Sequence, residues 1–156
     1  MSELIGVTTL QKMINHAVPE ESGILLDNSW KVPGELLDTR YAVLKFKPYS
    51  ICEVLAYQLA NYIGIRVPHF KGIWTRDPIK VNRNETSGLF RVGILIEYLN
   101  NIRRISWERA VERDPVMVAK ILVLCIFDRL EWGELIEFDG NIYFIDLVLR
   151  QSPNDG

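Results

Sequence analysis

The stretch from Gly133 to Leu147, GELIEFDGNIYFIDL, limits what the chain can fold into more than any other feature. Two apolar runs with interspersed polar residues flank Asp139-Gly140, and this dipeptide is a strong signal for a two-residue β-turn. We therefore expect a β-hairpin. Glu134 and Asp146 lie near the two ends of this hairpin, and Asp128 precedes it. These carboxylates are either a cation site or the solvated rim of an ordinary hairpin.

Length and composition fit a single globular domain. The chain has 156 residues, of which 48% are hydrophobic and 24% charged, and its formal net charge is -2. This length is enough to bury a core, and this balance of charge argues against a disordered chain or a basic nucleic-acid-coating surface. We expect one domain over residues 1–156 and no nucleic-acid partner.

The sequence also predicts where the protein resides. No apolar run approaches the roughly 20 residues that span a bilayer, so we expect no membrane partner. Cys52 and Cys125 lie far apart in apolar helical patterns, without the spacing of a zinc site. We expect two reduced thiols in the core and a cytoplasmic protein.

The first half of the chain predicts strands around one helix, after a short helix at residues 8–16. A strand is expected from Tyr41 to Phe46, with alternate residues on opposite faces. Ser50 with Glu53 fits a capping box, and Gly64 fits the end of the helix that follows. We expect this helix to pack on the sheet through its larger apolar side chains, which are Ile51, Val54, Leu55, Leu59, Tyr62 and Ile63.

The second half predicts a buried strand, two helices and the hairpin. Residues 76–88 are polar and suggest a flexible loop, whereas the run from Leu89 to Leu99 suggests a central buried strand. Ser106 and Asp114 are expected to cap two helices, with Pro115 as the first residue of the second. That second helix is apolar nearly all round and should be buried. This order of elements predicts an α+β domain in which helices cover mainly one face of an antiparallel sheet.

Lys45 is the first candidate functional residue. A lysine in an apolar strand costs several kcal/mol if it is buried, charged and unpaired, so its ammonium needs a partner or a cleft. Glu53, in the first turn of the next helix, is a candidate counterion that would hold the ammonium toward a bound anion. Alternatively, Lys45 extends to solvent at a sheet edge and Glu53 only caps its helix.

The end of the buried strand is the second candidate. Glu97, Tyr98 and Leu99 precede the polar turn Asn100-Asn101, and backbone groups just past such a strand could read the edge of an adenine ring. A plain core strand is the alternative.

The hairpin carboxylates are the third candidate. Hairpin geometry should bring Glu134 and Asp146 toward the same end of the ladder. Two carboxylates repel unless a cation lies between them, and Mg²⁺ prefers one or two carboxylates plus phosphate oxygens. Acidic hairpin ends that only aid solubility remain the alternative.

Taken in order, these segments resemble the protein kinase-like fold. AVLKF resembles the strand whose lysine pairs with nucleotide phosphates, and GILIEYL is similar to the hinge strand. EVLAYQLANYIGIRVPHFKGIW resembles the glutamate-bearing helix and next strand of the HipA-like, phosphatidylinositol 3/4-kinase-like and actin-fragmin-kinase-like branches. FDRLEWGELIEFDGNIYFIDL resembles the catalytic loop, hairpin and metal-binding aspartate. The resemblance covers residues 18–149 and implies an N-lobe and hinge at about 17–99, with a much reduced helical C-lobe at 100–149 that ends in the hairpin.

This resemblance implies a nucleotide site made by the first part of the chain. Lys45 would contact the phosphates of ATP, Glu53 would orient Lys45, and the backbone from Glu97 to Leu99 would meet adenine. A loop near Glu20 to Gly23 would cover the nucleotide, although it contains no GxGxxG motif.

The resemblance assigns the chemistry to the carboxylates. Asp128 would orient or deprotonate the acceptor hydroxyl, and Asp146 would hold Mg²⁺. Glu134 stands where the kinase-like pattern has an asparagine metal ligand, and ten residues follow Asp146, so no activation segment or later helices are expected. The implied function is phosphoryl transfer from Mg-ATP to a protein hydroxyl.

Two alternatives remain from the sequence. One is an inactive pseudokinase-type scaffold that binds a partner protein through the apolar helix at residues 116–127. The other is a fragment or subunit of a split enzyme.

Overall fold

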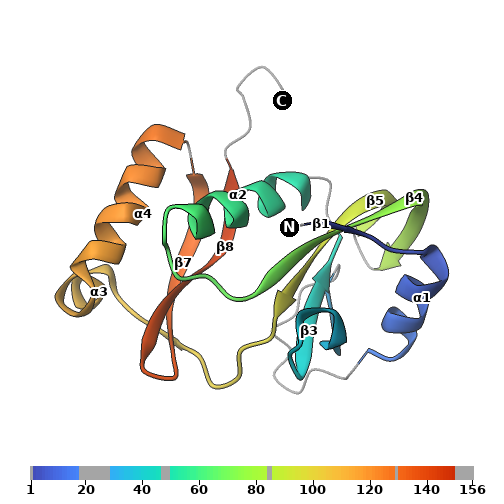
Figure 1. Cartoon of the computed structure of the whole chain (residues 1–156), viewed down its shortest axis with the longest axis horizontal. Helices are drawn as coiled ribbons and strands as arrows, with labels where there is room; N and C mark the ends of the chain where they lie inside the picture. The colour runs from blue at the N-terminus through green and yellow to red at the C-terminus, as the bar shows by residue number, and fades with distance from the viewer. Residues whose placement is uncertain (1, 18–28, 47–49, 84–85, 129, 150–156) are drawn as a thin grey trace. The chain divides into compact units, whose positions relative to one another are not determined.

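The chain folds into two compact units that both combine helices with strands (Figure 1). Unit 1 comprises Met1–Ile51 and His69–Tyr98, and unit 2 comprises Cys52–Pro68 and Leu99–Gly156. The predicted α+β class is therefore confirmed. No helix in the described ranges has both the length and the apolar character needed to cross a membrane. This computed structural model describes residues 2–17, 29–46, 50–83, 86–128 and 130–149.

Unit 1 is built on a five-stranded sheet with the order β1-β4-β5-β3-β2. All its pairs are antiparallel except β1 with β4, so the prediction of a purely antiparallel sheet is wrong at this edge. Because β1 has only three residues, no strand periodicity could reveal it. The elements are β1 (Ser2–Leu4), α1 (Val7–Asn15), β2 (Ser29–Pro33), the 3-10 turn η1 (Glu35–Leu37), β3 (Tyr41–Lys45), β4 (Phe70–Arg83) and β5 (Thr86–Glu97).

The alternation predicted for β3 is confirmed. Ala42, Leu44 and Phe46 are fully buried and join the core that packs with α1 residue Leu10. Lys45 points to the opposite face of the sheet, because alternate strand residues do so, and it is half-buried there. Burying large apolar side chains of this kind contributes roughly 1.5–3 kcal/mol each, so this core fixes which face carries Lys45.

A long β4–β5 hairpin replaces the flexible loop predicted at residues 76–88, so that prediction is wrong for the described residues (Figure 1). Cross-strand pairing runs from Ile79 with Phe90 to Arg83 with Thr86. Ile79 is buried in the core, and it anchors this part of β4 even though polar residues surround it in sequence. The register shifts between Trp74 and Ile79.

Unit 2 contains a three-stranded sheet with the order β6-β7-β8 and most of the helical residues. The predicted hairpin is confirmed: Asp139 and Gly140 have φ angles of 50° and 79°, the left-handed values that its two-residue turn requires. The elements are α2 (Ser50–Tyr62, in this unit from Cys52), β6 (Arg103–Arg104), α3 (Trp107–Arg113), α4 (Pro115–Asp128), β7 (Leu130–Phe138) and β8 (Asn141–Leu149).

The helix ends predicted at Ser106, Asp114 and Gly64 are also confirmed, whereas Ser50, predicted as an N-cap, is the first residue within α2. The Ser106 hydroxyl accepts a hydrogen bond from the Arg109 backbone N–H at 3.3 Å, and an Asp114 carboxylate oxygen accepts one from Met117 N–H at 3.2 Å. Gly64 has a φ of 88°, which ends α2 in the conformation that glycine adopts without strain.

The predicted packing face of α2 is only partly right. Val54 is buried as predicted, and Leu59 and Ile63 are half-buried. The prediction is wrong for Ile51, Leu55 and Tyr62, which are exposed, and Tyr62 has 87% of its surface accessible. The buried face instead contains small residues and two polar ones: Glu53, Val54, Ala56, Tyr57 and Ala60. Small side chains let a helix approach its neighbours closely, so side-chain size misled the prediction.

The prediction that α4 is buried all round is wrong as well. Ile121 is fully buried, whereas Val116, Leu122 and Val123 each expose more than half of their surface. Cys125 is exposed too, so the prediction of two core thiols is wrong for this residue.

Candidate functional site

Unit 1 places Lys45 on the face of the sheet opposite the α1 core. β3 lies between β2 and β5, and Lys45 pairs with Ser29 and Ile94 across the two ladders. Residues that share its face by register are half-buried or buried and surround it with apolar and aromatic groups. We call this set the candidate nucleotide face: Lys31, Tyr41, Val43, Lys45, Ile94, Ile96 and Tyr98.

The end of this face near Tyr98 combines an ammonium with two aromatic rings. Lys31 Nζ lies 4.8 Å from the centroid of the Tyr41 ring and 4.2 Å from that of Tyr98. Tyr41 lies four residues from Lys45 along β3, which separates the rings from the lysine by about 13 Å. Ring surfaces at one end and a lysine about 13 Å away along the strand suit a ligand with a flat base and a charged tail.

The backbone at the end of β5 is partly committed to the sheet. Glu97 N–H donates to the His69 carbonyl at 2.8 Å, and Tyr98 N–H donates to the Tyr41 carbonyl at 3.0 Å. These two donors are therefore not available to an adenine edge. The contact with adenine that the sequence predicts is therefore limited to other backbone groups of the segment, such as the N–H of Leu99.

In unit 2, Asp146 has a left-handed backbone. Its φ is 56°, a conformation that costs a non-glycine residue free energy and that clusters at functional sites. The ladder explains how it arises: Glu134 pairs with Ile145, but Trp132 pairs with Val148, so β8 has one extra residue here. Such β-bulges redirect side chains and are frequent beside active sites.

A buried tyrosine of α2 contacts this bulge. The Asp146 N–H donates to the Tyr57 hydroxyl at 3.0 Å, and Tyr57 is 1% exposed. Glu53 lies one helical turn before Tyr57 and therefore on the same face of α2. It is also 1% exposed. The helix face that carries the predicted glutamate is thus the face that meets the predicted metal-binding aspartate.

Glu134 has an ion-pair partner. Its carboxylate lies 2.8 Å from Arg104 Nε, and the Arg104 side chain is 84% exposed. Among the side chains that the structure describes, no group of three or more His, Cys, Asp or Glu residues could hold a metal. The Asp128 side chain and the predicted covering loop at Glu20 to Gly23 lie outside the described part of the chain.

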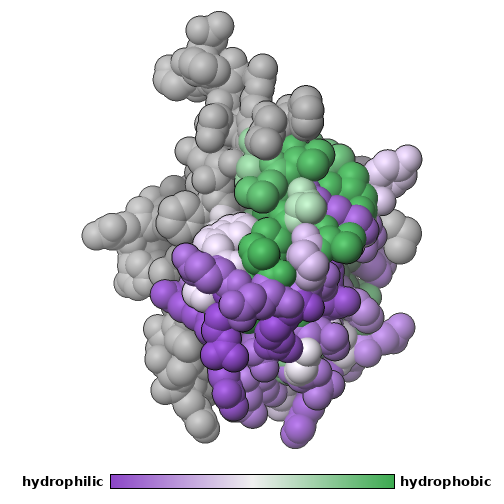
Figure 2. All heavy atoms as spheres, turned by 90° about the vertical axis from the view of Figure 1, so that its left-hand side faces the viewer, coloured by the Kyte–Doolittle hydropathy of each residue, from purple (hydrophilic) through white to green (hydrophobic). Residues whose placement is uncertain are grey.

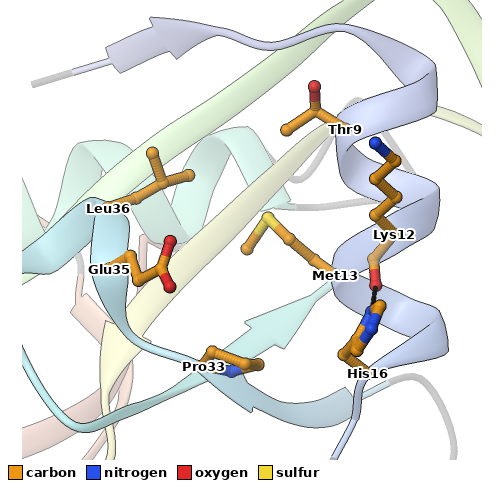
Figure 3. A pocket seen from close by; sticks show the side chains of 7 residues that line it. All are labelled: Thr9, Lys12, Met13, His16, Pro33, Glu35 and Leu36. Atoms are coloured by element: carbon orange, nitrogen blue, oxygen red, sulfur yellow. Dashed lines mark hydrogen bonds between the residues drawn. The ribbon is translucent and has the colours of Figure 1, made fainter.

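Each unit also has an open surface pocket that the sequence did not predict. In unit 1 a pocket of about 360 Å³ lies between α1 and the β2–η1 segment (Figure 3). Met13 and Leu36 point into it, with Lys12 on the helix side and Glu35 opposite (Figure 3). His16 Nδ1 lies 2.8 Å from the Lys12 carbonyl, so this ring nitrogen is engaged by its own helix.

The pocket in unit 2 has a basic lining and a volume of about 520 Å³. We call it the arginine pocket. The near-neutral net charge of the whole chain argued against a basic site, although four arginines between residues 103 and 113 are a local signal for one. Its lining residues are Arg103, Arg104, Ile105, Ser106, Arg109, Arg113 and Glu137.

No family model, curated protein or solved structure matches the chain.

Proposed function

We propose that the chain is a kinase-like domain that binds ATP with Mg²⁺ and transfers the γ-phosphoryl group to a protein hydroxyl. The observation that carries this proposal is the left-handed backbone of Asp146, bonded to the Glu53-bearing face of α2 through Tyr57. A bulge that redirects one aspartate and is hydrogen-bonded to the helix that carries a buried glutamate is not needed if the acidic residues serve only to keep the hairpin soluble.

The proposed role of Asp146 is to hold the Mg²⁺ that accompanies ATP. Magnesium takes one or two carboxylates and completes its shell with phosphate oxygens and water, so a site of this kind needs no larger acidic cluster. Glu134 would be the second ligand only if it gave up its ion pair with Arg104. We therefore propose Asp146 as the main protein ligand and Glu134 as the weaker candidate.

Unit 1 supports the proposal through the order of its strands. The lysine strand β3 pairs directly with β5, whose end is the hinge-like segment, although α2 and β4 lie between them in sequence. Lys45 would neutralise phosphate oxygens, while backbone groups between Glu97 and Leu99, other than the two N–H donors bonded within the sheet, would read adenine. The rings of Tyr41 and Tyr98 lie on the same face.

The proposed reaction relies on positioning and charge neutralisation. The acceptor oxygen attacks the γ-phosphorus of ATP. The bond between the γ-phosphorus and the bridging oxygen of the β-phosphate breaks, so that ADP leaves, and the acceptor hydroxyl loses its proton. Lys45 and the Mg²⁺ ion held by Asp146 would neutralise the phosphates, and Asp128 would orient or deprotonate the hydroxyl. We also propose a cytoplasmic location, where Mg-ATP is present and thiols stay reduced.

Transfer of labelled phosphate from ATP tests this function. The wild type should label itself or an added protein mixture, and Asp128→Asn should lower the rate by about 10²-fold or more. Asp139→Asn is the matched control, because Asp139 lies at the exposed turn of the hairpin. If Asp128→Asn leaves the labelling unchanged, the role proposed for Asp128 is refuted. If the wild type labels nothing, the proposed phosphoryl transfer is refuted.

An inactive scaffold is the second candidate, and the exposed side of α4 favours it. The view of the side that carries α4 shows a hydrophobic patch above hydrophilic surface (Figure 2). On α4, Val116, Leu122 and Val123 are exposed apolar side chains, and exposed apolar patches mark interaction sites. Light scattering after size exclusion, with a hydrophobic dye, discriminates: a strict monomer that binds no dye would count against the scaffold.

A further inference from the structure

We propose that the arginine pocket of unit 2 binds a phosphorylated side chain of a partner protein. This inference does not depend on the proposed nucleotide site, because the arginine pocket uses none of its residues. The proposal rests on the number, spacing and ion pairs of the guanidinium groups that β6 and α3 bring together.

Two elements position these groups. On α3, Ser106, Arg109 and Arg113 follow each other at intervals of three and four residues, so they lie along one side of the helix. On the sheet, Arg103 of β6 lies opposite Glu137 of β7, and directly opposed residues project to the same face. The Arg113 guanidinium also bonds to the Glu137 carboxylate. Arg103 and Arg113 therefore flank the same carboxylate.

The ion pairs show which charges are left for a ligand. Arg104 pairs with Glu134, and Arg113 pairs with Glu137. In the part of the chain that the structure describes, Arg103 and Arg109 have no carboxylate partner, and both are exposed. Two guanidinium groups that form no ion pair in the described part of the chain therefore remain, and their combined charge matches the charge of about -1.5 to -2 on a phosphorylated side chain at pH 7.

Guanidinium groups suit phosphate in geometry as well as in charge. Their N–H donors form a planar fork that binds phosphate oxygens in bidentate fashion. Arg113 would already be held in place, because its second nitrogen donates to the Gly140 carbonyl at 2.8 Å. A fixed guanidinium loses less conformational entropy on binding than a free one.

The surroundings favour a phosphorylated protein over the other carriers of phosphate. A long polyanion such as RNA would meet the interspersed carboxylates Glu134 and Glu137 and a chain of net charge -2. A free phosphate ion would have only exposed guanidiniums in high dielectric, where such pairs contribute little. A protein segment adds contacts to the apolar side chains beside the arginines, Ile102 and Ile105, of which Ile102 is 40% exposed.

The test is an NMR titration of the ¹⁵N-labelled full chain with a nine-residue alanine-glycine peptide that carries one central phosphoserine. We expect shift changes centred on residues 103–113, and no such changes with the unphosphorylated peptide. Arg103→Ala with Arg109→Ala should weaken binding at least about tenfold, since it removes two charge-assisted contacts. The matched control, Arg76→Ala with Arg91→Ala, removes two exposed arginines of unit 1 and should change nothing.

Further arms separate the sources of the anion. Inorganic phosphate that binds as tightly as the peptide would overturn the partner assignment, and so would a ribonucleotide oligomer that binds more tightly than the peptide. Equal binding of both peptides, or an equal loss in the control variant, would overturn the arginine pocket itself. All four positions are exposed, so these variants should keep the wild-type unfolding midpoint.

Discussion

Tyr57→Phe removes one oxygen atom and tests whether α2 holds the Asp146 bulge. The hydroxyl accepts the Asp146 N–H at 3.0 Å, and the ring is 1% exposed. Phenylalanine keeps the ring and its packing but leaves that N–H without this acceptor. Losing the partner of a buried donor costs about 1–3 kcal/mol. Because this hydrogen bond is only part-buried, water offsets some of the loss, and we expect about 1–2 kcal/mol.

Urea unfolding, followed by far-UV circular dichroism, measures this loss. With a slope of about 2 kcal/mol/M, the midpoint should fall by about 0.5–1 M. Tyr62→Phe is the matched control on the same helix, and it should leave the midpoint unchanged because Tyr62 is 87% exposed. Amide exchange at Asp146 should also accelerate in Tyr57→Phe. Equal midpoints for the two variants, with unchanged exchange at Asp146, would refute the contact between α2 and the bulge.

Two further substitutions test the sheet and the strain. Gly93→Ala should destabilise the chain by about 1–3 kcal/mol, since the new Cβ would lie 2.7 Å from the Phe46 ring. Gly88→Ala is the control in the same strand. Its new Cβ meets only the ring of Phe90, at 3.3 Å, so it should lower the free energy of unfolding far less in the same urea assay. Asp146→Gly should raise the free energy of unfolding by about 0.5 kcal/mol, because glycine adopts positive φ without strain. The same variant should lose Mg-ATP binding. A destabilised variant that still binds nucleotide would contradict the idea that the strain at Asp146 serves function.

Local signals account for the parts of the fold that the sequence predicted. Asp139-Gly140 predicted the hairpin turn because few residues adopt positive φ, and both do so here. Ser106 and Asp114 predicted two helix starts because their side chains cap free backbone N–H groups, and both bonds are present. These interactions join residues at most three positions apart, so a short stretch of sequence is enough to predict them.

The errors came from tertiary packing. Large aliphatic residues were expected to pack α2, but Ala56 and Ala60 lie on the buried face while Leu55 is exposed. The polar segment around Ile79 forms a strand because that one side chain reaches the core. Which face of a helix is buried, and whether a polar segment forms a strand, depends on the elements that pack against it. A local pattern of apolar residues does not show which elements these are.

The candidate site was only partly predictable for the same reason. Lys45 stood out as a cation in an apolar strand, and Asp146 as an acidic residue at a strand end. The bond between Asp146 and Tyr57 joins residues 89 positions apart, so no local pattern could predict it. The left-handed φ of Asp146 also had no sequence signal, because aspartate adopts many conformations. The arginine pocket did have a signal, in the density of arginine between residues 103 and 113.

Calorimetric titration of the full chain with ATP in Mg²⁺ tests the central claim most directly. We predict saturable heat for the wild type, and loss of that heat when Mg²⁺ is chelated. Lys45→Ala and Asp146→Asn should lose binding, and asparagine preserves the left-handed backbone at position 146. Asp139→Asn, the same change at the other left-handed aspartate of the hairpin, should bind like the wild type. No heat with the wild type, or equal heat in all four proteins, would contradict the proposed nucleotide site.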